Sequence, residues 1–129
     1  MENNITIIDY GYGNLHSIQS AFNKLKISTI ITKKNAEIEN SKIIILPGVG
    51  SFYQAMNAIK KLKLDISIRK ALDGNANILG ICLGYQMLFQ ESEEFGINKG
   101  LGILEGKVIS LKNFSKKNDR VPNVGWRPL

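Results

Sequence analysis

The sequence has 129 residues, which is short for more than one domain, and its 43% hydrophobic and 22% charged residues are typical of a globular rather than a disordered chain. The net charge of +6 comes mostly from lysines spread along the chain without interleaved aromatic residues, which argues against a nucleic-acid-binding surface. No apolar run is long enough to span a bilayer, and the single cysteine excludes an internal disulfide and disfavours a metal site built from cysteines. We therefore expect a cytoplasmic protein that binds no membrane, nucleic acid or metal.

The N-terminal part of the chain alternates between strand and helix patterns. Residues 5–8 form a β-branched run, residues 9–14 are rich in turn formers, and apolar residues then recur at helical spacing over 15–25. A second β-branched run covers 27–32, and the polar segment after it is expected to be a loop with a short helical turn. Residues 43–46 are apolar on both faces, which is typical of a buried strand in a parallel sheet.

The next helix is expected to begin at Ser51, because Gln54 stands three residues later and completes a capping box. Its predicted buried stripe consists of five apolar residues: Phe52, Ala55, Met56, Ile59 and Leu62. Asp65 is a candidate cap for a further short helix that runs through Leu72.

Residues 77–81 are expected to form a fourth buried strand that leads directly into a helix carrying Tyr85 to Phe89. After Glu94, glycines separate short apolar pieces at 101–104 and 107–111, which we interpret as hairpin-like or edge strands. The fold class is therefore α/β, with a doubly wound, mostly parallel sheet and helices on both faces. We expect a single domain over residues 1–129 whose C-terminal part is missing, because the sequence stops without a closing element.

Residues 80–84 read Gly-Ile-Cys-Leu-Gly between a predicted strand and a predicted helix. A nucleophile between two glycines in this setting is typical of a nucleophile elbow, and the start of a helix favours the reactive thiolate. Cys82 is therefore the candidate nucleophile, and the backbone N–H of Leu83 is a candidate donor to an oxyanion. The alternative is that Cys82 is a structural cysteine, which is the commoner role of a lone cysteine.

Two other glycine-containing loops are predicted at the same edge of the sheet. Residues 47–51 could bring backbone N–H groups close to a developing negative charge, or could simply be a turn that needs glycine. Residues 9–14 contain G-x-G but not the full dinucleotide fingerprint, so a nucleotide cofactor is weakly supported. The single histidine, His16, is expected to be an exposed helix residue, which leaves Cys82 without a credible base.

Four segments of the sequence, in the same order along the chain, resemble one enzyme family. Residues 47–52 resemble the oxyanion-strand motif of class I (triad) glutamine amidotransferases, and residues 80–89 resemble their nucleophile elbow. Residues 9–15 and 121–126 are similar to the corresponding segments of the glutaminase subunits of imidazole glycerol phosphate synthases.

This resemblance implies that Cys82 attacks the side-chain amide of glutamine, releasing ammonia and forming a thioester that water hydrolyses to glutamate. It implies an oxyanion hole formed by the segment with Val49 and Gly50 together with the N–H of Leu83. It implies no metal and no other cofactor for this subunit.

The resemblance also implies binding roles for five further residues. Gln86 and Gly48 would help to hold the glutamine. Asn14, Ser17 and Trp126 would lie near the interface with a (β/α)8-barrel cyclase subunit, the heterodimer partner that uses the ammonia to make imidazole glycerol phosphate in histidine biosynthesis.

The sequence departs from the family pattern in two ways. The family completes its triad with a His-x-Glu motif on a later strand, and this sequence ends before such a motif, so we expect the chain to be inactive and marginally stable when isolated. Asn123, Val124 and Arg127 also differ from the family's usual residues around Gly-Trp. These differences leave open a related amidotransferase subunit for surface-sugar biosynthesis, or a non-catalytic fragment that only binds a partner.

Overall fold

The computed structural model describes residues 5–114, 116, 121–122, 125–126 and 128. Its main sheet has four parallel strands in the order β2-β1-β3-β4. These strands are β1 (Ile5–Ile8), β2 (Ile30–Thr32), β3 (Ile43–Leu46) and β4 (Asn77–Gly80). The predicted strands at 5–8 and 43–46 are confirmed, whereas the second strand is shorter than the predicted range of 27–32.

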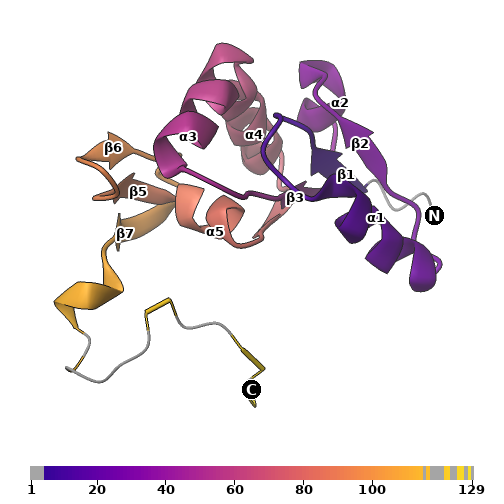
Figure 1. Cartoon of the computed structure of the whole chain (residues 1–129). Coiled ribbons are helices and arrows are strands. Elements are labelled where there is room, and N and C mark those ends of the chain that lie inside the picture. Colours follow the sequence, from indigo (N-terminus) through magenta and orange to yellow (C-terminus); the bar gives the residue numbers. More distant parts are fainter. Residues whose placement is uncertain (1–4, 115, 117–120, 123–124, 127, 129) are drawn as a thin grey trace.

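Helices cover both faces of this sheet, as predicted. Ile5, Ile7 and Ile45 pack on one face against α1 (Leu15–Lys24). The other face packs against three helices: α2 (Asn35–Glu39), α3 (Phe52–Lys61) and α4 (Leu64–Asp73). Figure 1 shows α3 and α4 on the side of the sheet opposite to α1. The α/β fold class with a mostly parallel sheet is therefore confirmed, and no helix in the described residues is long and apolar enough to cross a bilayer.

Strand β4 lies at an edge of the main sheet in the described structure, and it is not buried on both faces. Leu79 pairs in register with Ile45, yet its side chain is 54% exposed because α1 does not extend over β4. Ile78 points to the opposite face and packs against the core beneath α3 and α4. The prediction of a fourth fully buried strand is therefore wrong for one face.

Two leucines at the ends of predicted helical patterns are exposed because the helices end before them. Leu25 follows α1 and is 68% exposed, and Leu62 follows α3 and is also exposed. In each case the residue that follows the leucine, Lys26 or Lys63, has a left-handed backbone that turns the chain away from the helix axis. The other predicted residues of the α3 stripe are all buried.

The predicted helix caps are also corrected by the structure. Ser51 is the N-cap residue of α3, but its side chain makes no capping hydrogen bond, so the capping box with Gln54 is absent. The N–H of Phe52 instead donates to Oε2 of Glu94 at 2.8 Å. Asp65 lies inside the first turn of α4, which begins after Lys63, and does not cap it.

The chain after β4 forms a short helix and a small second sheet. Helix α5 (Leu83–Met87) stops before Phe89, so the prediction that it carries Phe89 is wrong. The second sheet has the order β6-β5-β7, and its strands are β5 (Phe89–Ser92), β6 (Asn98–Lys99) and β7 (Leu104–Val108). Strand β7 overlaps both predicted edge strands, but residues 101–103 are not in a strand.

Candidate functional site

Three loops follow β1, β3 and β4 and meet at the carboxyl edge of the main sheet (Figure 1). Open parallel sheets bind ligands at this edge, beside the point where the strand order reverses, which here lies between β1 and β3. The loops make close contacts: a Cβ atom at Gly48 would lie 2.6 Å from the backbone nitrogen of Gly84. The glycine at position 48 is therefore what allows the loop after β3 to pack against the loop after β4.

Cys82 lies between β4 and α5 with φ 55° and ψ −118°, a conformation that residues with a side chain rarely adopt. Its side chain is exposed. A Cβ atom at Gly80 would lie 2.5 Å from the Cα of Tyr85, and one at Gly84 would overlap the carbonyl oxygen of Leu46. The tight strand–turn–helix geometry predicted for residues 80–84 is present, and both flanking glycines are sterically required.

The loop after β3 presents backbone N–H groups to the same edge. Gly48 is buried, whereas Val49 and Gly50 are exposed, and Gly50 has a φ of +92° that favours glycine. In the described part of the chain, the N–H groups of Val49, Gly50 and Leu83 donate to no protein acceptor. Such free donors beside an exposed thiol are suited to binding an anion that forms on a substrate.

Tyr10 in the loop after β1 contacts the other two loops. Its side chain is buried, and its hydroxyl donates to the carbonyl oxygen of Pro47 at 2.7 Å. Burial, and then the charge of the nearby Cys82 thiolate, hold the pKa of Tyr10 above its usual range. Tyr10 therefore remains a neutral hydrogen-bond donor well above neutral pH.

Gln86 lies one helical turn after Cys82, since its N–H donates to the Cys82 carbonyl oxygen at 3.2 Å. Its side chain lines a cavity of about 360 Å³ together with seven other residues: Ser92, Glu93, Glu94, Phe95, Val108, Ile109 and Ser110. The carboxylates and hydroxyls in this wall suit a small polar ligand better than an apolar one.

No described contact joins the other predicted site residues to Cys82. Asn14 is the N-cap of α1, where its side chain accepts a hydrogen bond from the N–H of Ser17 at 3.2 Å. Ser17 and His16 are exposed on α1, and no described hydrogen bond or ion pair joins His16 to Cys82. The Trp126 side chain is fully exposed. Asn123, Val124 and Arg127 fall outside the described residues.

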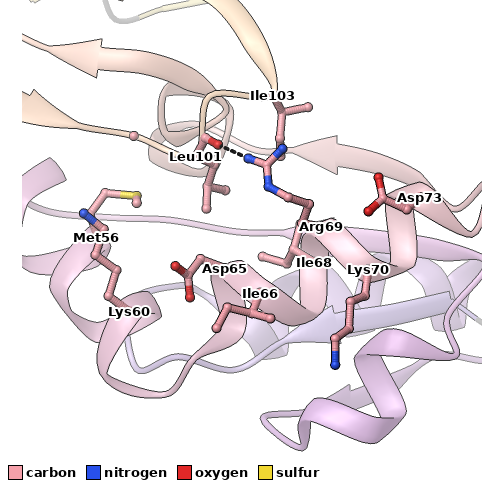
Figure 2. Close-up of a pocket in the computed structure, with 11 residues that line it drawn as sticks. Met56, Lys60, Asp65, Ile66, Ile68, Arg69, Lys70, Asp73, Leu101 and Ile103 are labelled. Carbon is pink, nitrogen blue, oxygen red and sulfur yellow. Dashed lines mark hydrogen bonds between the residues drawn. The ribbon is translucent and has the colours of Figure 1, made fainter.

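A second hollow, of about 250 Å³, lies between α3, α4 and residues 100–103 (Figure 2). Figure 2 shows the Arg69 guanidinium reaching across to Leu101, and it donates to the Leu101 carbonyl oxygen at 2.7 Å. Lys70 turns away toward α2, where its Nζ contacts Glu39 at 3.2 Å. No residue of the three site loops lines this hollow, and two of its charged residues, Arg69 and Lys70, join α4 to neighbouring elements.

Two residues in contact with the site were not singled out from the sequence. Tyr10 was only part of a turn-rich stretch, and nothing in the local pattern indicates that its hydroxyl reaches Pro47, 37 residues away. Glu94 binds the first N–H of α3 from 42 residues away. Neither contact leaves a signal within a sequence window, because each depends on how the loops meet in space.

The sequence matches a known family over nearly its whole length. A model of the family "Glutamine amidotransferase class-I" matches residues 6–125. A relative from Geobacillus sp. (strain WCH70), named "Imidazole glycerol phosphate synthase subunit HisH", is 43% identical over 127 residues, covering 97% of this chain and 60% of the relative. A relative of the same name from Bacillus subtilis (strain 168) is 42% identical over 127 residues with the same coverage. This chain thus spans about 60% of the length of these curated relatives.

A solved structure supports the fold independently. A chain described as "Crystal structure of glutamine amidotransferase" superposes with a TM-score of 0.69 at 22% sequence identity. The superposition covers 81% of this chain and 55% of that chain. At this identity the likeness bears on the fold alone, and it agrees with the parallel sheet described above.

Proposed function

Because the chain belongs to the class I glutamine amidotransferase family, we propose that it carries the nucleophile and the oxyanion donors of a glutaminase. The observation that supports this most directly is the exposed Cys82 in a strained turn, with unpaired N–H groups of Val49, Gly50 and Leu83 at the same edge of the sheet. We propose that residues 1–129 form part of a single glutamine amidotransferase domain, since the chain spans about 60% of its curated relatives.

In this proposal the Cys82 thiolate adds to the side-chain carbonyl carbon of glutamine. The carbonyl oxygen becomes an oxyanion that the free N–H groups of Val49, Gly50 and Leu83 stabilise. The C–N bond then breaks, the nitrogen takes a proton and leaves as ammonia, and Cys82 is left as a glutamyl thioester. Water attacks the thioester, which releases glutamate and restores the thiol.

The proton transfers need a base, and the histidine of this sequence does not provide one. His16 is exposed on α1 and shares no described interaction with Cys82. We propose that the base is a histidine outside these 129 residues. On this view the isolated chain forms the thioester slowly, because nucleophile and base act as a unit.

Glutamine recognition is assigned to the cavity beside α5. Gln86 lies on the same helix as the elbow and faces the polar wall that includes Glu94. Gly48 is buried against the loop after β4, where it fixes the backbone that leads to the exposed Val49 and Gly50. Both residues are proposed to orient the amide carbon of glutamine toward Cys82.

The acceptor of the ammonia is proposed from the relatives, which are named as subunits of imidazole glycerol phosphate synthase. We propose that this protein acts in the cytoplasm as the glutaminase subunit of a heterodimer with a (β/α)8-barrel cyclase. The exposed residues Asn14, Ser17 and Trp126 are proposed to face that subunit.

A glutamine-like diazoketone tests the proposed site in the 129-residue chain. The reagent should attach to Cys82, L-glutamine should slow the reaction, and D-glutamine, the matched control, should not. Cys82→Ser should remove the label, which mass spectrometry of the intact chain detects. Labelling that L-glutamine does not slow, or that persists in Cys82→Ser, would contradict the proposed site.

A binding experiment tests the proposed partner. The immobilised chain should retain a barrel cyclase of histidine biosynthesis and should not retain the acceptor subunit of a surface-sugar amidotransferase. Trp126→Ala should weaken retention, whereas Leu111→Ala, which also removes an exposed apolar side chain, should leave it unchanged. Retention of the sugar-pathway subunit alone would favour that branch instead.

A further inference from the structure

We propose that the Tyr10 hydroxyl is a positioning group that fixes the backbone of residues 48–50 beside Cys82. Tyr10 does not reach the reacting atoms in this proposal; it acts through the peptide group that follows Pro47. The effect of Tyr10 on oxyanion binding rests on the proposed glutaminase function, whereas its effect on the backbone of residues 48–50 does not.

The hydrogen bond from Tyr10 to Pro47 constrains the start of the oxyanion segment. The donor and acceptor are both buried, and the distance between the Tyr10 hydroxyl and the Pro47 carbonyl oxygen is 2.7 Å. The carbonyl of Pro47 and the N–H of Gly48 belong to one planar peptide group. Holding the carbonyl oxygen therefore also sets the direction of the Gly48 N–H and of the chain that follows it.

Beyond the packing of Gly48 against the Cys82 loop, no described backbone hydrogen bond holds the segment in place. Gly48 and Gly50 flank Val49, and glycines permit a wide range of backbone angles. The N–H groups of Val49 and Gly50 make no hydrogen bond within the described residues. A donor to an oxyanion is effective only when it already points at the site, so a fixed anchor at Pro47 matters for the two residues beyond it.

Steric contacts place the same hydroxyl against the Cys82 loop. A Cβ atom at Gly48 would lie 2.9 Å from the Tyr10 hydroxyl oxygen and 2.8 Å from the Cβ of Leu83. The Tyr10 ring stacks on Tyr12 with ring centroids 6.0 Å apart. Tyr12 in turn lies 4.0 Å from where a Cβ atom at Gly50 would be. The loop after β1 thus contacts both ends of the segment 48–50.

Tyr10→Phe isolates the hydroxyl, because it keeps the ring that packs in the core and stacks on Tyr12. Nuclear magnetic resonance of the 129-residue chain should show a shifted Pro47 carbonyl carbon. The N–H order parameters of Val49 and Gly50 should fall from about 0.85 to below about 0.6, or relaxation dispersion should appear at these residues. Tyr53→Phe is the matched control, since the Tyr53 side chain is exposed on α3, and it should change neither signal.

Two cysteine reagents separate a positioning role from a general loss of structure. The glutamine-like diazoketone depends on the oxyanion donors, whereas iodoacetamide needs only an accessible thiolate. Tyr10→Phe should slow the diazoketone about five- to ten-fold, the factor expected from one hydrogen bond, and should change the iodoacetamide rate less than about two-fold. A merely structural role would change both rates together.

Unchanged dynamics at residues 48–50 in Tyr10→Phe would overturn the proposal, and so would an equal change in the two labelling rates. If the wild-type chain shows no preference for the L-glutamine analogue, the proposed glutaminase function fails. The resonance measurement would still decide whether the hydroxyl holds the segment.

Discussion

At the scale of single residues, the Cys82 turn depends on the absence of side chains at its neighbours. The flanking glycines can be identified from the sequence, and the strand–turn–helix context predicted from them is present. The packing that makes Gly84 necessary cannot be predicted from the local sequence, because its neighbour Leu46 belongs to another strand. The nucleophile could therefore be proposed from a local motif, whereas the contacts that shape its surroundings could not.

Gly84→Ala should lower the free energy of unfolding by about 3 kcal/mol or more, because the new methyl group meets the rigid backbone of Leu46. Chemical denaturation of the 129-residue chain measures this change. Gly74→Ala is the control: Gly74 has an ordinary φ of −82° and ends α4, so its effect should stay within about 1 kcal/mol. Equal effects at the two glycines would show that the close approach at Gly84 is not a constraint.

Tyr10 should make stability sensitive to alkaline pH. Its pKa in the folded chain is raised above the ordinary value of 10.0, chiefly by burial and also by Cys82. Below pH 10 the phenol is neutral in both the folded and the unfolded chain, and its contribution to the free energy of unfolding is complete. Above pH 10 the unfolded chain loses the proton first, so the contribution shrinks until pH reaches the pKa of the folded state.

Urea unfolding between pH 8 and pH 11 measures this effect. The stability of the wild-type chain should fall more steeply above pH 10 than that of Tyr10→Phe, which has no phenolic proton. The comparison cancels the titration of the lysines, since both chains contain them. If stability falls equally with pH in the two chains, the pKa of Tyr10 is not raised by burial.

At the scale of elements, local patterns located the helices and strands better than they located their ends. The stripe of α3 is buried as predicted, yet its cap comes from Glu94 rather than from Ser51 and Gln54. Helix α5 is shorter than expected because the carbonyl groups at its end accept hydrogen bonds from residues 101–104 instead of continuing the helix. Both differences arise from segments that are distant in sequence.

The cap of α3 can be tested by removing each candidate acceptor. Glu94→Ala should destabilise the chain by about 1 kcal/mol, because the Phe52 N–H loses a charged acceptor at a helix N-terminus. Ser51→Ala should cost less than about 0.5 kcal/mol, since its side chain makes no capping bond. Thermal unfolding followed by circular dichroism gives both values. A larger loss of stability in Ser51→Ala than in Glu94→Ala would show that Ser51 caps the helix after all.

At the scale of the whole molecule, the main sheet has one side that the described part of the chain leaves open. The α/β class and the parallel order follow from alternating strand and helix patterns, but the sequence predicted cover on both faces of β4. Leu79 and Ile43 are instead exposed on the face that α1 does not reach. Which strand of a parallel sheet lies at its edge depends on the order of pairing, and local patterns do not contain that order.

The open side of β4 should cause self-association as protein concentration rises, because it combines apolar side chains with a strand edge that no described strand pairs. Leu79→Lys should reduce this association, and analytical ultracentrifugation over a range of concentrations measures it. Leu111→Lys replaces a similarly exposed leucine outside both sheets and should have little effect. Equal behaviour of the two variants would assign the association to another surface.

The meeting of the three loops also has a consequence for how the chain reaches this structure. The contact between Tyr10 and Pro47 spans 37 residues, and the contact between Phe52 and Glu94 spans 42. Contacts of such long range form slowly, because the entropy of loop closure must be lost first. A partly folded chain would therefore carry a mobile thiol before its neighbours are in place. Refolding in aerated buffer without a reductant, where dissolved oxygen is the oxidant, would favour disulfide-linked dimers through Cys82.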